Sequence, residues 1–446
     1  MRTVALLLGT LVAGGGAAAA VVTVIVPPAP AMHLRHRDAR PGADSVRVAR
    51  LLDALGKTDP VVCDLIGDQL GNFWWSGGRA SLGRLADAPV GLQSVKDSLG
   101  GSITDPRAIA LLTVRLGDDD PCVRRVAAKL LGNSDVTPTR LAALLSADAP
   151  RIRESAALAA GESDRPELRV PLERLLEDRS VPVATMSAWA LGQLEDKASQ
   201  PALTRAVKAS TGRVRLAAVW ALGRLEVPDA AVDIEPVLRD ADPLARTIAA
   251  EALGRLENKR SAAALLAVLG DAVASVREAA ADALGQLEAL EARNPLERTL
   301  DRDTDASVRR AAAEALGRLS SPHSATVLAK ALTDADADVR AAAVDAIGNL
   351  DDLHVAPPEL VRALSSRDPE LRRQVAHALG RIADPATTAA LVGLLEDSDR
   401  EVRLAAVEGL GEIGTAAVMP GLTRALADKD PEVRRSAAER LGDIKD

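Results

Sequence analysis

The chain has 446 residues, 26% of them charged, and a formal net charge of −8. A mildly acidic chain lacks the basic stripe that nucleic-acid binding normally needs, so the composition excludes nucleic acid from the expected partners. Aromatic residues are scarce, with one Phe and no Tyr, and the four tryptophans therefore stand out.

The first segment is apolar. Only Arg2 is charged before Arg35, and residues 3–26 are mostly Leu, Val, Ala and Gly. Ala29-Pro30-Ala31 matches a small-x-small cleavage site, so we predict that residues 1–31 are an export signal. The run is also long enough to span a bilayer, which leaves an uncleaved membrane anchor as the alternative. We expect a linker at 32–43 and a periplasmic or other extracytoplasmic location, free or anchored to the inner membrane.

The repeat region is predicted to begin with a first unit at 44–71, which an insertion at 72–104 separates from the regular repeats at 105–446. The insertion holds Phe73, Trp74 and Trp75, the only aromatic cluster of the chain. Because insertions in solenoids often carry binding residues, Trp74 and Trp75 are candidates for partner binding. The simpler interpretation is that these rings cover the gap between the first unit and the others.

The two cysteines, Cys63 and Cys122, lie on either side of the insertion. An exported protein could join them in a disulfide. Because the insertion separates their helices, we expect two independent buried thiols instead.

A thirteen-residue frame recurs along the rest of the chain, and its clearest copy is DPEVRRSAAERLG at 430–442. From Gly161 onward the closing glycines are 31 or 32 residues apart. A fixed period of this size indicates a solenoid of stacked units. The sequence therefore predicts an all-α fold, an α-α superhelix of about twelve helical hairpins.

Each frame has the pattern of a helix with its ends. Asp430 is predicted to be the N-cap, Pro431 suits the first helical turn, and Gly442 is predicted to supply the left-handed residue that ends the helix. A short apolar segment precedes each frame and predicts the first helix of the hairpin; examples are Pro201–Lys208, Ala262–Leu269, Ser324–Leu332 and Thr387–Leu395.

An arginine occupies the same position of nearly every frame, four residues after the cap. Such an arginine can pair with a cap aspartate of its own unit or of the next one. Because it recurs regardless of any local site, we interpret the series as a structural ladder. Its clearest members are Arg215, Arg246, Arg277, Arg309, Arg340, Arg372, Arg403 and Arg434.

The frame DPxVRxxAAxALG resembles the short HEAT-like repeat family, the type first associated with phycobilin lyases and found in exported bacterial proteins. The resemblance extends from about Asp44 to Gly442. It implies a superhelix whose second helices line a concave face. The family includes enzymes, scaffolds and binding proteins, so the resemblance by itself does not define an activity.

The position three residues before each closing glycine is predicted to lie on the exposed, concave side of the second helix. This column contains two successive tryptophans followed by acidic residues. The candidate partner-binding residues in it are Trp189, Trp220, Glu251, Asp282, Glu314 and Asp345. For the tryptophans we favour partner binding. For the acids, a solvated face with local ion pairs such as Arg310/Glu314 is the simpler interpretation.

Enzyme motifs are absent from the sequence, which has no HExxH, GxSxG, P-loop or CxxC, and none of the five histidines is followed by Glu. We therefore expect no catalytic residues, metal or cofactor. The hypothesis is an exported or membrane-anchored scaffold that binds a basic or amphipathic protein or peptide along its concave face. The alternative is a phycobilin-lyase-like or other small-molecule enzyme that uses the same groove.

Overall fold

The computed structural model describes residues 43–55 and 103–444. Within these two ranges the only β-type contact is an isolated bridge that joins Ile103 and Ser134. The rest of the regular structure is helical, so the predicted all-α superhelix is confirmed. The predicted export segment, most of the linker and the insertion residues Trp74 and Trp75 lie outside the described ranges.

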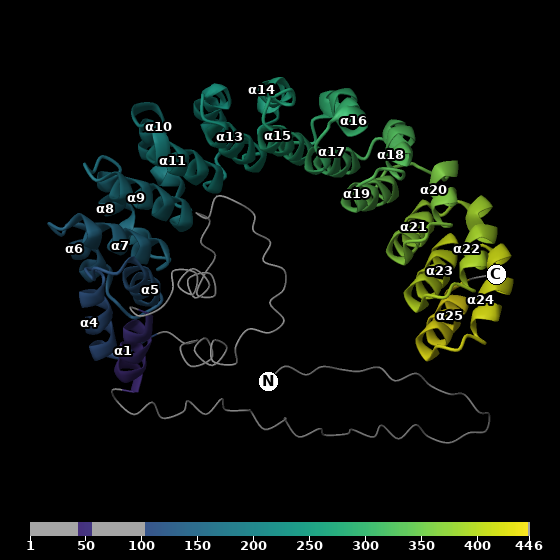
Figure 1. Cartoon of the computed structure of the whole chain (residues 1–446), viewed down its shortest axis with the longest axis horizontal. Helices are drawn as coiled ribbons and strands as arrows, with labels where there is room; N and C mark the ends of the chain where they lie inside the picture. The colour runs from purple at the N-terminus through teal and green to yellow at the C-terminus, as the bar shows by residue number, and fades with distance from the viewer. Residues whose placement is uncertain (1–42, 56–102, 445–446) are drawn as a thin grey trace, which may run out of the picture.

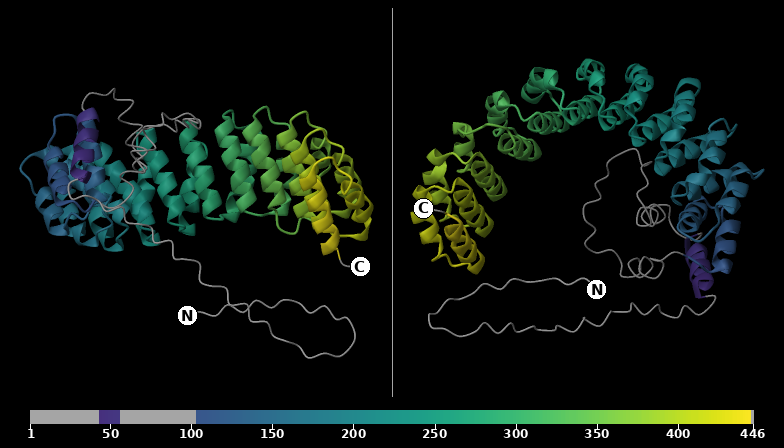
Figure 2. Two further views of the ribbon diagram at one scale, coloured as in Figure 1. Left: turned by 90° about the horizontal axis from the view of Figure 1, so that it is seen from below. Right: turned by 180° about the vertical axis from the view of Figure 1, so that it is seen from behind.

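Eleven helical hairpins follow one another from residue 106 to residue 443 and form an arc (Figure 1). Two further views show that the hairpins stand side by side along this arc (Figure 2). The helix α1 (Ala43–Leu55) packs against the first hairpin at one end. It begins the predicted first unit, whose remainder lies beyond the described residues.

The first helix of each hairpin lies on the outer, convex side of the arc (Figure 1). Most of these helices are short, and a 3-10 turn often precedes them, for example η5 (Lys259–Ser261). They are α4 (Pro106–Arg115), α6 (Pro138–Leu145), α8 (Arg169–Leu175), α10 (Gln200–Ala209), α12 (Ala231–Ile234), α14 (Ala262–Val268), α16 (Arg293–Arg302), α18 (Ala325–Ala331), α20 (Pro358–Ala363), α22 (Thr388–Leu394) and α24 (Met419–Ala425).

The second helix of each hairpin lies on the inner, concave side, and each packs against the second helices of its neighbours. Alanines fill much of this contact; in α17, for example, Ala311, Ala312 and Ala313 are fully buried. The second helices are α5 (Pro121–Gly132), α7 (Pro150–Gly161), α9 (Val181–Leu194), α11 (Gly212–Arg224), α13 (Pro243–Arg255), α15 (Ala274–Gln286), α17 (Ala306–Arg318), α19 (Ala337–Gly348), α21 (Pro369–Ile382), α23 (Arg400–Ile413) and α25 (Pro431–Asp443).

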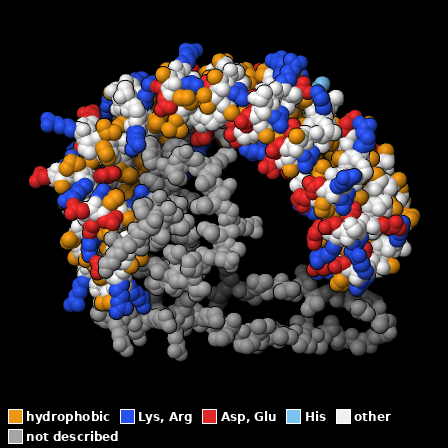
Figure 3. All heavy atoms as spheres, viewed as in Figure 1, with side chains coloured by type: hydrophobic (Ala, Val, Ile, Leu, Met, Phe, Trp, Pro, Cys, Tyr) orange, Lys and Arg blue, Asp and Glu red, His pale blue; other side chains and the backbone are white. Residues whose placement is uncertain are grey.

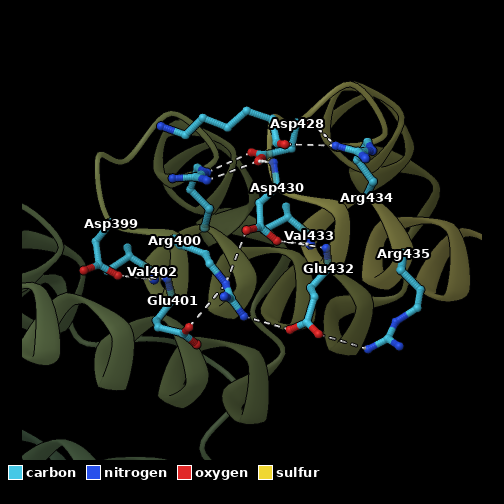
Figure 4. Close-up of polar contacts among 12 residues, drawn as sticks. Asp399, Arg400, Glu401, Val402, Asp428, Asp430, Glu432, Val433, Arg434 and Arg435 are labelled. Carbon is cyan, nitrogen blue, oxygen red and sulfur yellow. Dashed lines mark hydrogen bonds and ion pairs between the residues drawn. The ribbon is translucent and has the colours of Figure 1, made fainter.

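The predicted helix start is confirmed in α25. The Asp430 carboxylate accepts hydrogen bonds from the backbone N–H groups of Glu432 and Val433 at 2.8 and 3.4 Å, and Pro431 occupies the first turn. The same cap forms at Asp399, whose carboxylate accepts from Glu401 and Val402 (Figure 4). These bonds satisfy N–H groups that have no partner inside the helix.

The predicted role of the closing glycine is wrong. Gly442 lies inside α25, and the left-handed conformation comes three residues after the glycine in most units, as at Glu257 after Gly254 and Gly414 after Gly411. The glycines instead allow adjacent second helices to approach closely. A Cβ on Gly317 would lie 2.9 Å from the Cα of Ala346 in the next unit, a distance that real Cβ atoms essentially never show.

Candidate functional site on the concave face

The column of residues three positions before each closing glycine differs between the two halves of the arc. In the first four hairpins these side chains are buried: Lys129 is 1% exposed, Leu158 4%, and Trp189 and Trp220 8% each. The prediction that the two tryptophans are exposed is therefore wrong. Their proposed role in partner binding stays a prediction.

The tryptophans are buried because each ring lies against the preceding hairpin. A Cβ on Gly161 would be 2.6 Å from Cζ3 of Trp189, and a Cβ on Gly192 would be 2.7 Å from Cζ3 of Trp220. The missing side chain of the glycine thus makes room for the ring. The guanidinium carbon of Arg224 lies 5.9 Å from the centroid of the Trp220 ring, within the range of a cation–π contact.

Both rings nevertheless border a pocket of 280 Å³ on the concave side, between α5, α7, α9 and α11. Its apolar lining includes Leu158, Met186 and Val181, and Val181 is 54% exposed beside the pocket. A volume of this size holds about nine water molecules, taking about 30 Å³ for each. The pocket is therefore large enough for one or two side chains of a bound segment.

The polar lining of this pocket is mainly basic. Arg124, Arg125 and Arg213 border it, whereas Glu154 is its one acidic residue. Burial raises the pKa of Glu154, against the opposing effect of the nearby Arg124 charge. None of these four residues was predicted to bind a partner, because none lies in the column three positions before the closing glycine. Arg125 and Glu154 both lie seven positions before their own closing glycines, a second column that the repeat would have revealed.

The concave face of the second half carries charged side chains that pair with one another. Arg310 donates to Glu278 at 2.9 Å and to Glu314 at 2.6 Å, and Arg381 lies 3.7 Å from Asp345. The predicted pair of Arg310 and Glu314 is thus present. In a space-filling view, acidic and basic side chains lie next to one another along the inner wall of this half (Figure 3).

The acidic column is only partly exposed. Glu251, Asp282 and Glu314 have intermediate exposure, and Asp345 is the one exposed residue of the four candidate acids. Burial raises the pKa of Asp282, and the neighbouring Glu314 carboxylate raises it further. Asp345 and Glu314 border a hollow between α17 and α19 that also contains Arg310, Arg318 and Asp338. The two halves of the concave face therefore offer different chemistry at equivalent positions.

The ladder arginines pair with an aspartate that the predicted frame omits. Arg309, for example, donates from Nε and Nη2 to the two carboxylate oxygens of Asp334, both at 2.8 Å, and from Nη1 to the carbonyl of Asp303 at 3.0 Å. The aspartate lies two residues before the cap of the next unit and also accepts the N–H of that cap residue. The pairs are Arg153–Asp178, Arg215–Asp240, Arg246–Asp271, Arg277–Asp303, Arg309–Asp334, Arg372–Asp397 and Arg403–Asp428.

These pairs fix each hairpin to the next one. Most members have less than a sixth of the side chain exposed, as for Arg372 at 13% and Asp397 at 10%. The hydrogen bonds from Arg372 hold the pKa of Asp397 below its usual value. The aspartate could have been found from the sequence, because a D-x-D pattern precedes the helix in several units, for example Asp397 with Asp399.

The ladder is interrupted at Arg340, and Arg434 is its last member within the described residues. At the position where the other units have the aspartate, the unit after Arg340 has Ser366, and Arg340 lies 3.9 Å from the cap Asp368 instead. Arg434 lies in the last described hairpin, and its Nη1 donates to the carbonyls of Asp428 and Lys429 at 2.7 and 3.1 Å (Figure 4).

Cys122, at the start of α5, is disulfide-bonded, so the prediction of an independent thiol is wrong for this residue. The other cysteine of the chain, Cys63, lies outside the described residues.

In the ranges 43–55 and 103–444, no helix has the length and apolar character needed to cross a membrane. No group of three or more His, Cys, Asp or Glu side chains in these ranges is arranged to hold a metal ion.

The stacked hairpins define the molecule as an α-solenoid, and sequence comparison identifies the type of repeat. The HEAT repeat family matches residues 137–223, 206–285, 262–348, 325–401 and 393–446. These matches together span more than half of the chain, which therefore belongs to the HEAT repeat family. None of the curated proteins matches it.

Two solved structures are among those that match this chain. One is an engineered protein, 22% identical, with a TM-score of 0.43; the match covers 76% of this chain and 99% of that one. The other comes from a study of Kap95p binding to RanGDP in nuclear import complex assembly. It is 16% identical, with a TM-score of 0.49, and the match covers 90% of this chain and 58% of that one.

Proposed function

We propose that this protein is a non-enzymatic scaffold that binds a protein or peptide segment along its concave face. The observation that supports the proposal most is the 280 Å³ pocket between α5, α7, α9 and α11, which combines two tryptophan rings with arginine side chains. Trp and Arg are the residue types that most often dominate binding energy at interfaces. Repeat solenoids also present extended concave surfaces on which a long segment can lie.

We further propose that the scaffold works outside the cytoplasm, either exported or anchored through residues 3–26. The apolar N-terminal run supports this location. The disulfide at Cys122 also supports it, because structural disulfides persist mainly in oxidising compartments. Fractionation of the native cells, with mass spectrometry of the N-terminus, tests both points. Recovery of the full N-terminus in a cytosolic fraction would contradict the proposal.

Site-specific photo-crosslinking tests the concave face directly. A photoreactive residue in place of Val181, 54% exposed beside the pocket, is compared with one in place of Val232, 69% exposed on the convex α12. We expect discrete adducts in the native envelope from position 181 and none from position 232. Equal crosslinking from the two positions, or none from position 181, would count against binding at the concave face.

A further inference from the structure

The junction between α19 and α21 lacks the ion pair that ties most neighbouring hairpins together. The ladder arginine of α19 is Arg340, and Ser366 occupies the position of its aspartate partner. The Nη2 atom of Arg340 lies 3.9 Å from the carboxylate of Asp368, whose side chain is 42% exposed. A long, solvated contact of this kind contributes little to stability. The junctions on either side, α17/α19 and α21/α23, both have the full pair with two hydrogen bonds.

The two helices of this junction also pack together differently. The helix α19 packs less extensively against α21 than against α17. A Cβ on Gly348 would lie closest to the guanidinium of Arg381, with its Nε at 2.7 Å, whereas a Cβ on Gly317 would lie closest to the main chain of Ala346. The same guanidinium lies 3.7 Å from the carboxylate of Asp345, and both side chains are exposed, at 43% and 64%. The end of a flexible, solvated side chain therefore lies against Gly348.

The chain segment that enters the next hairpin is longer here than in the neighbouring units. Residues 349–357 connect α19 to α20 and contain no 3-10 turn. By comparison, residues 319–321 connect α17 to η7 (Pro322–Ser324), and residues 383–384 connect α21 to η8 (Pro385–Thr387). The apolar core continues through α19, α20 and α21. Apolar packing has no preferred direction, so it holds the hairpins together without fixing the angle between them.

We infer that this junction is a hinge, about which the hairpins from α20 to α25 turn as one arm relative to the rest of the arc. These hairpins form one end of the arc in Figure 1, so the motion changes the width of its opening. A hinge of this type takes up the change of backbone angles in a few residues at the ends of helices, here 349–357. The hinge belongs to the free protein and does not depend on the proposed partner.

Pulsed electron spin resonance on the free, full chain tests the hinge. Nitroxide labels are attached through ketone-bearing residues at pairs of exposed positions, which leaves the disulfide at Cys122 intact. The pair Leu290/Met419 spans four junctions that include α19/α21, and the matched pair Val170/Leu290 spans four junctions that do not. At about 10 Å for each hairpin, both distances are roughly 40 Å. We expect a distance distribution at least about 1.5-fold wider for Leu290/Met419. Equal widths would overturn the inference.

The substitution Ser366→Asp supplies Arg340 with the missing partner. It should narrow the Leu290/Met419 distribution to the width of the Val170/Leu290 distribution. The matched control is Ser365→Asp, which adds the same charge at an exposed neighbouring residue outside the ladder position and should leave the width unchanged. No narrowing by Ser366→Asp, or equal narrowing by both substitutions, would overturn the role of the missing pair in the hinge. Circular dichroism checks that each variant folds, and the two label pairs in the natural sequence still decide if Ser366→Asp does not.

Discussion

The two halves of the concave face are built on the same repeat but present different surfaces. Trp189 and Trp220 are buried against the preceding hairpin in the first half, whereas Glu314 is half-buried and Asp345 exposed at the equivalent positions of the second half. The repeat frame therefore determines how the hairpins stack, whereas the residue type three positions before the closing glycine can differ from unit to unit. The difference teaches that one position of the repeat can serve the core in one unit and the surface in another.

The largest effect is expected at the tryptophans. Trp220→Ala removes a buried ring that lies against Gly192, and such truncations cost about 3–5 kcal/mol of stability. Asp345→Ala, at the exposed equivalent position, should change stability by no more than about 0.5 kcal/mol. Urea unfolding followed by circular dichroism measures both. Equal effects of the two substitutions would contradict the difference between the halves.

The closing glycines offer a comparison between the interior and the end of the arc. Gly317→Ala places a Cβ 2.9 Å from Ala346 Cα, and overpacking of this kind costs about 1–3 kcal/mol. At Gly442 nothing lies within 4 Å of the added Cβ, so Gly442→Ala should stabilise the last helix by up to about 1 kcal/mol. Thermal unfolding should shift in opposite directions for the two variants. A stabilising Gly317→Ala would refute the close-packing role.

The ladder pairs should contribute less than the buried rings. Asp397→Asn weakens the pair with Arg372 and is expected to cost about 1 kcal/mol, because solvent still reaches part of both side chains. The converse variant, Ser366→Asp, offers Arg340 the partner that its unit lacks and should add less than about 1 kcal/mol. A loss of stability in Ser366→Asp would show that this interruption is required by the local packing.

The ladder also predicts a dependence on pH. The native pKa of Asp397 lies below its usual value of 3.8 because Arg372 donates to its carboxylate. The stabilisation by this pair is therefore complete above about pH 4 and is lost as the pH falls through the lowered native pKa. The difference in unfolding free energy between the natural chain and Asp397→Asn should be present at pH 6 and should shrink below pH 3.8. A difference that persists in acid would exclude the ion pair as its cause.

The smallest effect concerns Asp282 in the acidic half. Its pKa is raised by burial and by Glu314, so its charge opposes folding at neutral pH. Asp282→Asn should stabilise the protein by about 0.5 kcal/mol at pH 7, and this gain should fade as the pH approaches 4. Asp345→Asn is the control, because Asp345 is exposed and lies 3.7 Å from Arg381. A loss of stability in Asp282→Asn at pH 7 would contradict the conclusion that the Asp282 charge opposes folding.

Much of the fold could be predicted from local features of the repeat. The cap at Asp430, the proline after it and the short apolar segments before each frame all act within a few residues, and each is present as predicted. The role of the closing glycine could not be predicted in this way. Its nearest obstacle is Ala346 for Gly317, a residue of the next hairpin, so the constraint appears only when the hairpins stack.

The candidate site was predicted less well, for the same reason. Helical periodicity placed Trp189 and Trp220 away from the apolar face of their own helices, but the rings lie on the glycines of the preceding hairpins. The sequence alone determined the period, the helix starts and therefore the HEAT-type solenoid, because these depend on short-range hydrogen bonding and propensity. Only the tertiary structure decided which column residues are buried and which side chains border the pocket beside the tryptophans, because both depend on side chains that adjacent hairpins bring together.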